Sequence, residues 1–256
     1  MIKVENTEVY GWEAAIRGMR NPMNSWEKSD SCYCKEPITA KCNNSGCSHC
    51  GWAWTNLGKN PFCIGDNDLT LMQKLVRAGT DHRKFMRMIT VSCDIIAPFY
   101  WWKQFDTYKI GTVTDSCSTM HKIAEKEFVL NDFSCEYLFN GTEEGTEFLK
   151  DFTYTIKALN KAREKYLETK KKIYWWQMIQ LLPSSYNQRR TVELNYEVLR
   201  NMCRKGRRLD HKLDEWRDFC GWMIENDGEE IIAIDKLNGI YRVQGEDMLA
   251  DVAALI

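Results

Sequence analysis

Residues 86–105 read MRMITVSCDIIAPFYWWKQF, and this stretch sets the fold class. The part from Met86 to Ile96 is rich in Ile, Val and Thr, which favours a β-strand, and Pro98 closes it. The aromatic part that follows can form a helix. A strand that leads directly into an apolar helix predicts a domain in which helices pack against a sheet.

The rest of the chain predicts more helices than strands. A further strand is expected at 2–10, and a polar loop at 112–121. The helices are expected at 12–21, 68–79 (capped by Asp66 or Asn67 and ended by Gly79), 145–172, 173–182, 191–204 and 210–225. We therefore expect one α+β domain over 1–256, with a Cys-rich insertion at 27–64.

Composition excludes several classes of function. The 256 residues are 44% hydrophobic and carry 35 basic against 36 acidic side chains, for a net charge of -1. This balance argues against a nucleic-acid partner. The longest apolar run, Ile95–Trp102, is broken by Pro98 and is far shorter than the roughly 20 residues of a membrane span. The charged N-terminus is no secretory signal, so we expect a cytoplasmic protein without a membrane partner.

The cysteines are concentrated near the N-terminus. Six of the eleven fall between Cys32 and Cys63. The pairs Cys32/Cys34 and Cys47/Cys50 have the spacing of turns that supply two zinc ligands each, with Cys42 and His49 as spare ligands. A closed site of this kind would be structural, because catalysis needs an open coordination position. The alternative is a loop of reduced thiols.

Other clusters permit more than one interpretation. The basic turn Arg204–Arg208 suits a phosphate or is a solvated connection between helices. A second basic cluster runs from His82 to Arg87. The segment Ser116–His121 offers a thiol and an imidazole, but neighbours in sequence are weak evidence for a catalytic pair. We expect the Trp pairs 101–102 and 175–176 in a core or a subunit interface; the alternative is a platform on which bases stack.

Several segments occur in an order that matches a known family. LMQKLVRAGTDH (71–82) precedes the strand MITVSCDI (88–95), and PFYWWKQFDTYKIGTVTDSCSTMH (98–121) follows. Leu182-Pro183 precedes Asn195–Met202, and then His211–Arg217. This series resembles the flavin-dependent thymidylate synthases, which carry LxxxLxxxGHxS, RHRxxSxNxxSxRY, LP, NxRxLxHF and HAQxEIR in the same order. The resemblance covers roughly Leu71 to Cys220.

The chain departs from these motifs at several charged positions. Thr107-Tyr108-Lys109 stands where the family has RHR, and Glu197 stands at the arginine of NxR. GHxS becomes Gly79-Thr80-Asp81-His82. In the second half of the long motif, Asp115, Ser118, Met120 and His121 align with one extra residue inserted, so that only the serine is kept. The residues retained across the motifs are Ser118, Asn195, Glu215 and Arg217.

The resemblance implies a fold of mixed sheet and long helices, a homotetramer with sites shared between subunits, and an FAD that hands hydride to a pyrimidine nucleotide. It implies a methyltransferase or oxidoreductase acting on dUMP or a related nucleotide. It places Asn195, Ser118 and His82 at the flavin and Arg217 at the nucleotide. Basic residues elsewhere (Arg83, Lys84, Lys109 or the turn Arg204–Arg208) would replace the missing phosphate contacts, and of these we expect Arg83 and Lys109 at the nucleotide. No protein nucleophile is required, so no catalytic residue is assigned. The alternative is a non-enzymatic relative that binds a nucleotide or a protein partner and carries a structural zinc.

Overall fold

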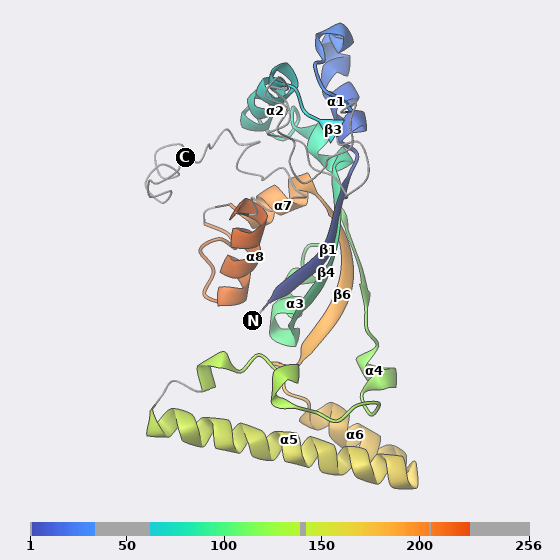
Figure 1. The fold of residues 1–256 in the computed structure, drawn as a ribbon, viewed down its shortest axis with the longest axis vertical. Coiled ribbons are helices and arrows are strands. Elements are labelled where there is room, and N and C mark those ends of the chain that lie inside the picture. Colours follow the sequence, from blue (N-terminus) through green and yellow to red (C-terminus); the bar gives the residue numbers. More distant parts are fainter. Residues whose placement is uncertain (1, 34–61, 139–141, 205, 226–256) are drawn as a thin grey trace, which may run out of the picture.

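The computed structural model describes residues 2–33, 62–138, 142–204 and 206–225 (Figure 1). Its centre is a four-stranded sheet of β1 (Lys3–Tyr10), β4 (Thr90–Pro98), β5 (Thr112–Ser116) and β6 (Asn187–Asn195). The strand order is β1-β4-β6-β5. The resemblance implies a mixed sheet, whereas these four strands pair antiparallel throughout. The α+β class is confirmed.

The helix predicted at 191–204 is wrong in its first part. β6 extends to Asn195, and only α7 (Tyr196–Met202) is helical. Along β6, Gln188, Val192 and Leu194 are buried while Arg189, Thr191 and Glu193 are exposed, which is the two-residue period of a strand. Hydrogen bonds to β4 on one side and β5 on the other settle the conformation, and they come from segments far away in sequence.

The loop predicted at 112–121 is also wrong. It contains β5 and the short helix α4 (Thr119–Lys122). β5 is an edge strand with mostly exposed side chains, so its sequence has no apolar alternation to reveal it. The strand predicted from Met86 begins later than expected, because a 3-10 helix, η4 (Lys84–Met88), precedes β4. Further 3-10 turns are η1 (Asn21–Met23), η2 (Trp26–Lys28), η5 (Leu130–Asp132) and η6 (Glu136–Leu138).

Helices α3 (Phe99–Phe105), α7 and α8 (Asp214–Glu225) lie on one side of the sheet (Figure 1). The core between them is aromatic. The ring centroids of Trp101 and Trp216 are 4.6 Å apart, and Trp102, Phe105 and Phe219 pack around them. The first Trp pair, 101–102, is therefore internal, as one of its two interpretations predicted.

At one end of the molecule, α1 (Trp12–Arg20) and α2 (Asp66–Arg77) flank the two-residue strands β2 (Cys32–Tyr33) and β3 (Phe62–Cys63) (Figure 1). β2 and β3 pair antiparallel, with Cys32 opposite Cys63. The Cys-rich insertion itself stays a prediction, because most of 27–64 lies outside the described residues. Three of the predicted zinc ligands, Cys34, Cys47 and Cys50, lie outside the described residues.

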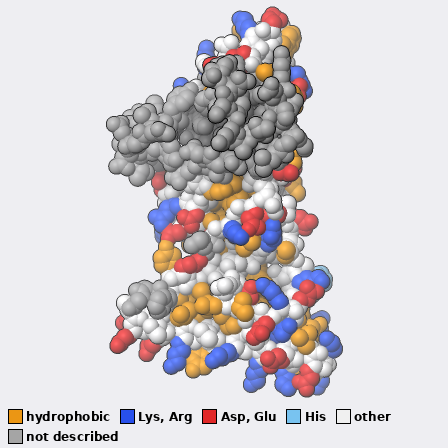
Figure 2. Space-filling view, viewed as in Figure 1, with side chains coloured by type: hydrophobic (Ala, Val, Ile, Leu, Met, Phe, Trp, Pro, Cys, Tyr) orange, Lys and Arg blue, Asp and Glu red, His pale blue; other side chains and the backbone are white. Residues whose placement is uncertain are grey.

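At the other end, α5 (Glu143–Thr169) and α6 (Lys172–Leu181) form a helical hairpin, close to the prediction (Figure 1). A second, smaller core joins it to residues 123–133 through Phe128, Phe133, Ile156, Leu159 and Met178. Trp176 remains 43% exposed. Figure 2 shows apolar side chains on the surface of this lower half of the molecule. None of the described helices combines the length and apolar character needed to cross a membrane.

Candidate functional site

Three of the motif segments meet at one end of the sheet. Thr90 of β4 is paired with Asn195 of β6, and Thr112 of β5 is paired with Leu194. The segment before β4, the loop before β5 and the helix after β6 therefore come together, although they are far apart in sequence. We call these segments, residues 82–89, 106–112 and 195–208, the motif end of the sheet.

Asn195 connects two of these segments. Its side-chain oxygen accepts a hydrogen bond from the backbone N–H of Val198 at 3.1 Å and so caps α7. Gly111 has a φ of +72°, and a Cβ there would lie 2.3 Å from Asn195 Nδ2, so only glycine fits. The loop that carries the exposed Lys109 is thereby held against Asn195. Next to it, Thr112 Oγ1 is buried without a hydrogen-bond partner among the described residues.

Arg83 is held by α7. Its Nε donates to both carboxylate oxygens of Glu197, at 3.1 and 3.0 Å. This ion pair holds Glu197, which stands at the arginine of the family's NxR motif, against the segment that precedes β4. His82 beside it is exposed. Arg200, on the same helix, is partly buried; its burial and the nearby Arg83 lower its pKa.

Arg208 is cradled by neutral groups. Its Nε donates to the hydroxyl of Tyr108 at 3.1 Å, and its Nη1 donates to Gln104 Oε1 at 2.6 Å. Its guanidinium carbon lies 4.5 Å from the centre of the Trp216 ring, which itself donates to the same Gln104 oxygen. Among the described residues, no carboxylate pairs with Arg208. A partly buried cation without a counter-ion is suited to bind an anion.

The predicted nucleotide residue Arg217 has a different environment. Its side chain is 54% exposed and pairs with Asp214 one turn earlier in α8. Glu215, in contrast, is buried and accepts a hydrogen bond from the hydroxyl of Tyr100 in α3. Burial and that carboxylate both raise the pKa of Tyr100 well above its ordinary value. Glu215 therefore ties α8 to α3.

Ser118 lies at the opposite end of β5 from the motif end. It caps α4, and its Oγ is 2.6 Å from Nδ1 of His121. Five residues of β5 separate it from the loop at Gly111, or about 16 Å at the usual rise of a strand. Within one chain, Asn195, Arg83 and Lys109 therefore lie at the same end of the sheet. Ser118 lies at the other end of β5.

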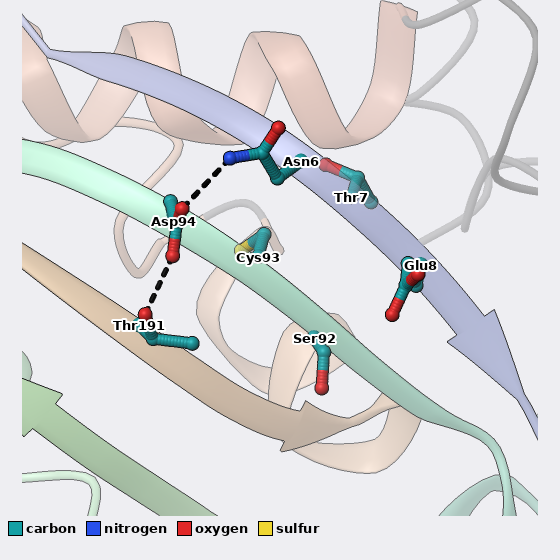
Figure 3. A pocket seen from close by; sticks show the side chains of 7 residues that line it. All are labelled: Asn6, Thr7, Glu8, Ser92, Cys93, Asp94 and Thr191. Carbon is teal, nitrogen blue, oxygen red and sulfur yellow. Dashed lines mark hydrogen bonds between the residues drawn. The ribbon is translucent and has the colours of Figure 1, made fainter.

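A separate hollow of about 430 Å³ lies along β1 and β4, beside the irregularity in their pairing between Glu5 and Glu8 (Figure 3). Its lining side chains are Asn6, Thr7, Glu8, Ser92, Cys93, Asp94 and Thr191. Asp94 accepts hydrogen bonds from Thr191, Arg189 and Asn6, which lower its pKa to about 2. Two carboxylates and no cation line this hollow, so it does not suit a phosphate.

The structure bears on the metal prediction only through Cys32, whose thiol is free and exposed. Within 2–33, 62–138, 142–204 and 206–225, no three His, Cys, Asp or Glu side chains gather as a metal site.

Two solved structures resemble the fold of this chain over nearly its whole length. The thymidylate synthase ThyX from Helicobacter pylori, complexed with FAD and dUMP, matches with a TM-score of 0.58 and 14% identity, over 94% of this chain and 98% of that one. The UMP/dUMP methylase PolB from Streptomyces cacaoi, bound with 5-Br dUMP, matches with a TM-score of 0.60 and 11% identity, over 94% and 96%. The chain has the fold of the flavin-dependent thymidylate synthases.

The sequence comparisons add little to this fold assignment. No curated protein sequence matches the chain. A family model described as phage tail tube protein FII matches residues 221–256 alone, a stretch that extends beyond the described residues. The thymidylate synthase-like fold therefore rests on the tertiary structure, together with the motifs in the sequence.

Sequence reasoning missed three residues of this site: Gln104, Tyr108 and Thr112. It named the turn Arg204–Arg208 as suited to a phosphate, but the sequence did not indicate which arginine of the turn is partly buried. Tyr108 occupies a motif position where the family carries histidine, and the structure shows it as the acceptor for Arg208.

Proposed function

We propose that this protein binds a pyrimidine nucleotide, dUMP or UMP, and methylates its base with the help of FAD. The observation that carries the proposal is Arg208, a partly buried guanidinium that has only neutral partners among the described residues. The two solved structures reported above, which are bound to dUMP or an analogue of it, support a pyrimidine nucleotide as the anion.

The residues at the motif end have donors and acceptors that can form hydrogen bonds with a flavin cofactor. The hydroxyl of Thr112 is left without a partner among the described residues, directly beside Asn195. Lys109 is exposed on the same loop, and His82 is exposed near α7. Asn195, Thr112 and His82 would hold the cofactor, which supplies the redox chemistry when it is bound, and Lys109 on the same loop stays a candidate for the nucleotide. The protein then has to bind, orient and exclude water, and it needs no nucleophile of its own.

Arg208 would bind and orient the nucleotide. Its stacking on Trp216 and its bond to Gln104 fix the plane of the guanidinium, so its remaining N–H groups are presented in one direction. Because the guanidinium is already oriented, Arg208 loses little conformational entropy when an anion binds to it. Its positive charge neutralises the negative charge of the substrate. Arg217 stays a second candidate, with Asp214 competing for its charge.

We further propose that the site is shared in a homotetramer. Ser118 is about 16 Å along β5 from the motif end, so we expect it to meet a flavin bound at the motif end of another subunit. Large apolar side chains remain exposed at the α5–α6 end: Tyr137, Phe148, Tyr154, Ile173 and Trp176. A contact between subunits would bury them. The cytoplasmic location and a structural zinc held by Cys32, Cys34, Cys47 and Cys50 remain part of the proposal.

The proposal is tested in two steps. Purified full-length protein is first titrated with FAD in the presence of dUMP and followed by visible absorbance and by calorimetry. It is then given dUMP or UMP tritiated at C5, together with a reduced flavin and a one-carbon donor, because methylation at that carbon releases the tritium. Nucleotide binding without flavin binding or tritium release would favour the non-enzymatic alternative. No binding of any pyrimidine nucleotide would refute both.

A further inference from the structure

Two cysteines are opposite each other in the small sheet formed by β2 and β3. Cys32 of β2 is the register partner of Cys63 of β3, and Tyr33 is the partner of Phe62. Residues directly opposite in an antiparallel pair have Cα atoms roughly 4.5–5.5 Å apart. A disulfide spans roughly 4.4–6.8 Å between Cα atoms. The backbone of this sheet therefore already has the spacing that a disulfide between the two residues needs.

Hydrogen bonds next to the pair fix its register. Ser31, one residue before Cys32, accepts through its Oγ from the backbone N–H of Gly65 at 3.0 Å. The carboxylate of Asp30 accepts from the backbone N–H of Asp68 at 3.1 Å, and the carboxylate of Asp68 accepts from the hydroxyl of Ser31. A slip of β2 along β3 would separate the two cysteines and would break these bonds. The two cysteines are thus held opposite each other by the structure around them.

The thiol of Cys32 is also open to reagents. It is free and exposed, whereas the thiols of Cys93, Cys203 and Cys220 are buried. Cys117 is the other exposed free thiol of the described residues, and it has no cysteine opposite it in the described sheets. Access and an opposed second cysteine therefore coincide at Cys32, and these are the two properties that a cysteine needs to form a disulfide after oxidation.

We propose that Cys32 and Cys63 are an oxidation site, at which a peroxide converts the two thiols into a disulfide. The Cys32 thiol attacks one oxygen of hydrogen peroxide; the O–O bond breaks, one water leaves and the sulfur becomes a sulfenic acid. The Cys63 thiol then attacks this sulfur, the S–S bond forms and a second water leaves. Two thiols together lose two electrons, and one peroxide is reduced to two waters.

The disulfide closes residues 33–62 into a loop, and an added thiol reduces it again. Cys32 is in addition one of the predicted zinc ligands, and a zinc ligand has to be a thiolate. The disulfide and a zinc ion bound through Cys32 therefore exclude each other. This oxidation site goes beyond the proposed nucleotide methylation and does not depend on it.

Peptide mapping of the full-length protein tests the proposal. Reduced protein is treated with hydrogen peroxide in the presence of a chelator, so that a bound metal does not mask the thiols. Free thiols are then alkylated, and mass spectrometry under non-reducing conditions locates the disulfides. We expect a linked pair of peptides that contain Cys32 and Cys63, which dithiothreitol separates. Cys117→Ser, which removes the other exposed thiol, should give the same linked pair.

The variant Cys63→Ser adds a second readout. Oxidation should stop there at the sulfenic acid of Cys32, because the second thiol is missing. We expect dimedone, which traps sulfenic acids, to label Cys32 at least about tenfold more in this variant than in the parent, where the neighbouring thiol reacts first. Equal labelling in both proteins would overturn the proposal. So would a peroxide-treated parent in which Cys32 stays reduced or is linked to another cysteine, and this result is obtained even if Cys63→Ser fails to fold.

Discussion

Asp68 is the residue whose replacement should most affect the stability of the end that carries the Cys-rich segment. Its carboxylate is fully buried in α2 and pairs with the buried Arg20 of α1, with 2.6 Å between Oδ1 and Nε. The other oxygen accepts from the hydroxyls of Ser29 and Ser31 and from the backbone N–H of Ser31. Arg20 in turn donates to the carbonyls of Ser25 and Lys28. One carboxylate thus fastens α1, α2 and residues 25–31 together.

The change Asp68→Asn keeps the shape and removes the charge. In either orientation of the amide, its NH₂ group takes the place of an oxygen that accepted hydrogen bonds, so the N–H or O–H donors on that side lose their acceptor. Arg20 also loses its counter-ion. Breaking a buried pair in this way costs about 3–5 kcal/mol, a large part of the roughly 5–15 kcal/mol that stabilises a folded protein. We therefore expect the free energy of unfolding in urea to fall by that amount at pH 7. Asp66→Asn, an exposed position in the first turn of the same helix, should cost under about 1 kcal/mol.

The pH dependence gives an independent check. Burial by itself would raise the pKa of Asp68, but hydrogen bonds from Ser31, Ser29 and Arg20 outweigh it and lower the pKa below its ordinary value. A carboxyl whose pKa is lower in the folded state stabilises the protein above its unfolded pKa of about 3.9. That contribution is lost as the pH falls through the folded pKa. The difference between parent and Asp68→Asn should be constant from about pH 5 to 8 and shrink below about pH 4. A difference under about 1 kcal/mol at pH 7 would refute the reasoning.

Three further outcomes are expected. Arg208→Gln should weaken dUMP binding by roughly ten- to a hundred-fold in calorimetry, and by more than Arg217→Ala; equal affinity in parent and Arg208→Gln would remove Arg208 from the site. Light scattering of the parent should give the mass of a tetramer, and Trp176→Glu should lower it, whereas a parent particle of 30.1 kDa would contradict the shared site. Elemental analysis of reduced protein should find about one zinc per chain and less in Cys32→Ser; no metal in the parent would end the zinc hypothesis.

The sequence alone determined the elements whose pattern is local. The 3- and 4-residue spacing of apolar side chains defined α5 to within a few residues, because one face of a helix can be recognised without its partner. The run of Ile, Val and Thr before Pro98 located β4, and the motif order indicated the family whose fold the structure confirms. Roles at the motif positions, such as Asn195 at the flavin, stay predictions.

Only the tertiary structure decided what depends on distant partners. The sequence predicts helix for the second half of β6, residues 191–195, because the strands that pair with it, β4 and β5, lie about 70 to 100 residues earlier in the chain. In the sequence, Arg208 is one of several basic residues in a turn. The structure shows its hydrogen bonds to Gln104 and Tyr108, which lie about 100 residues away in the chain. The same holds for Arg83 and Glu197, which are 114 residues apart. A side chain's charge is fixed by its own residue, but its counter-ion, burial and orientation are fixed by neighbours that only folding brings near.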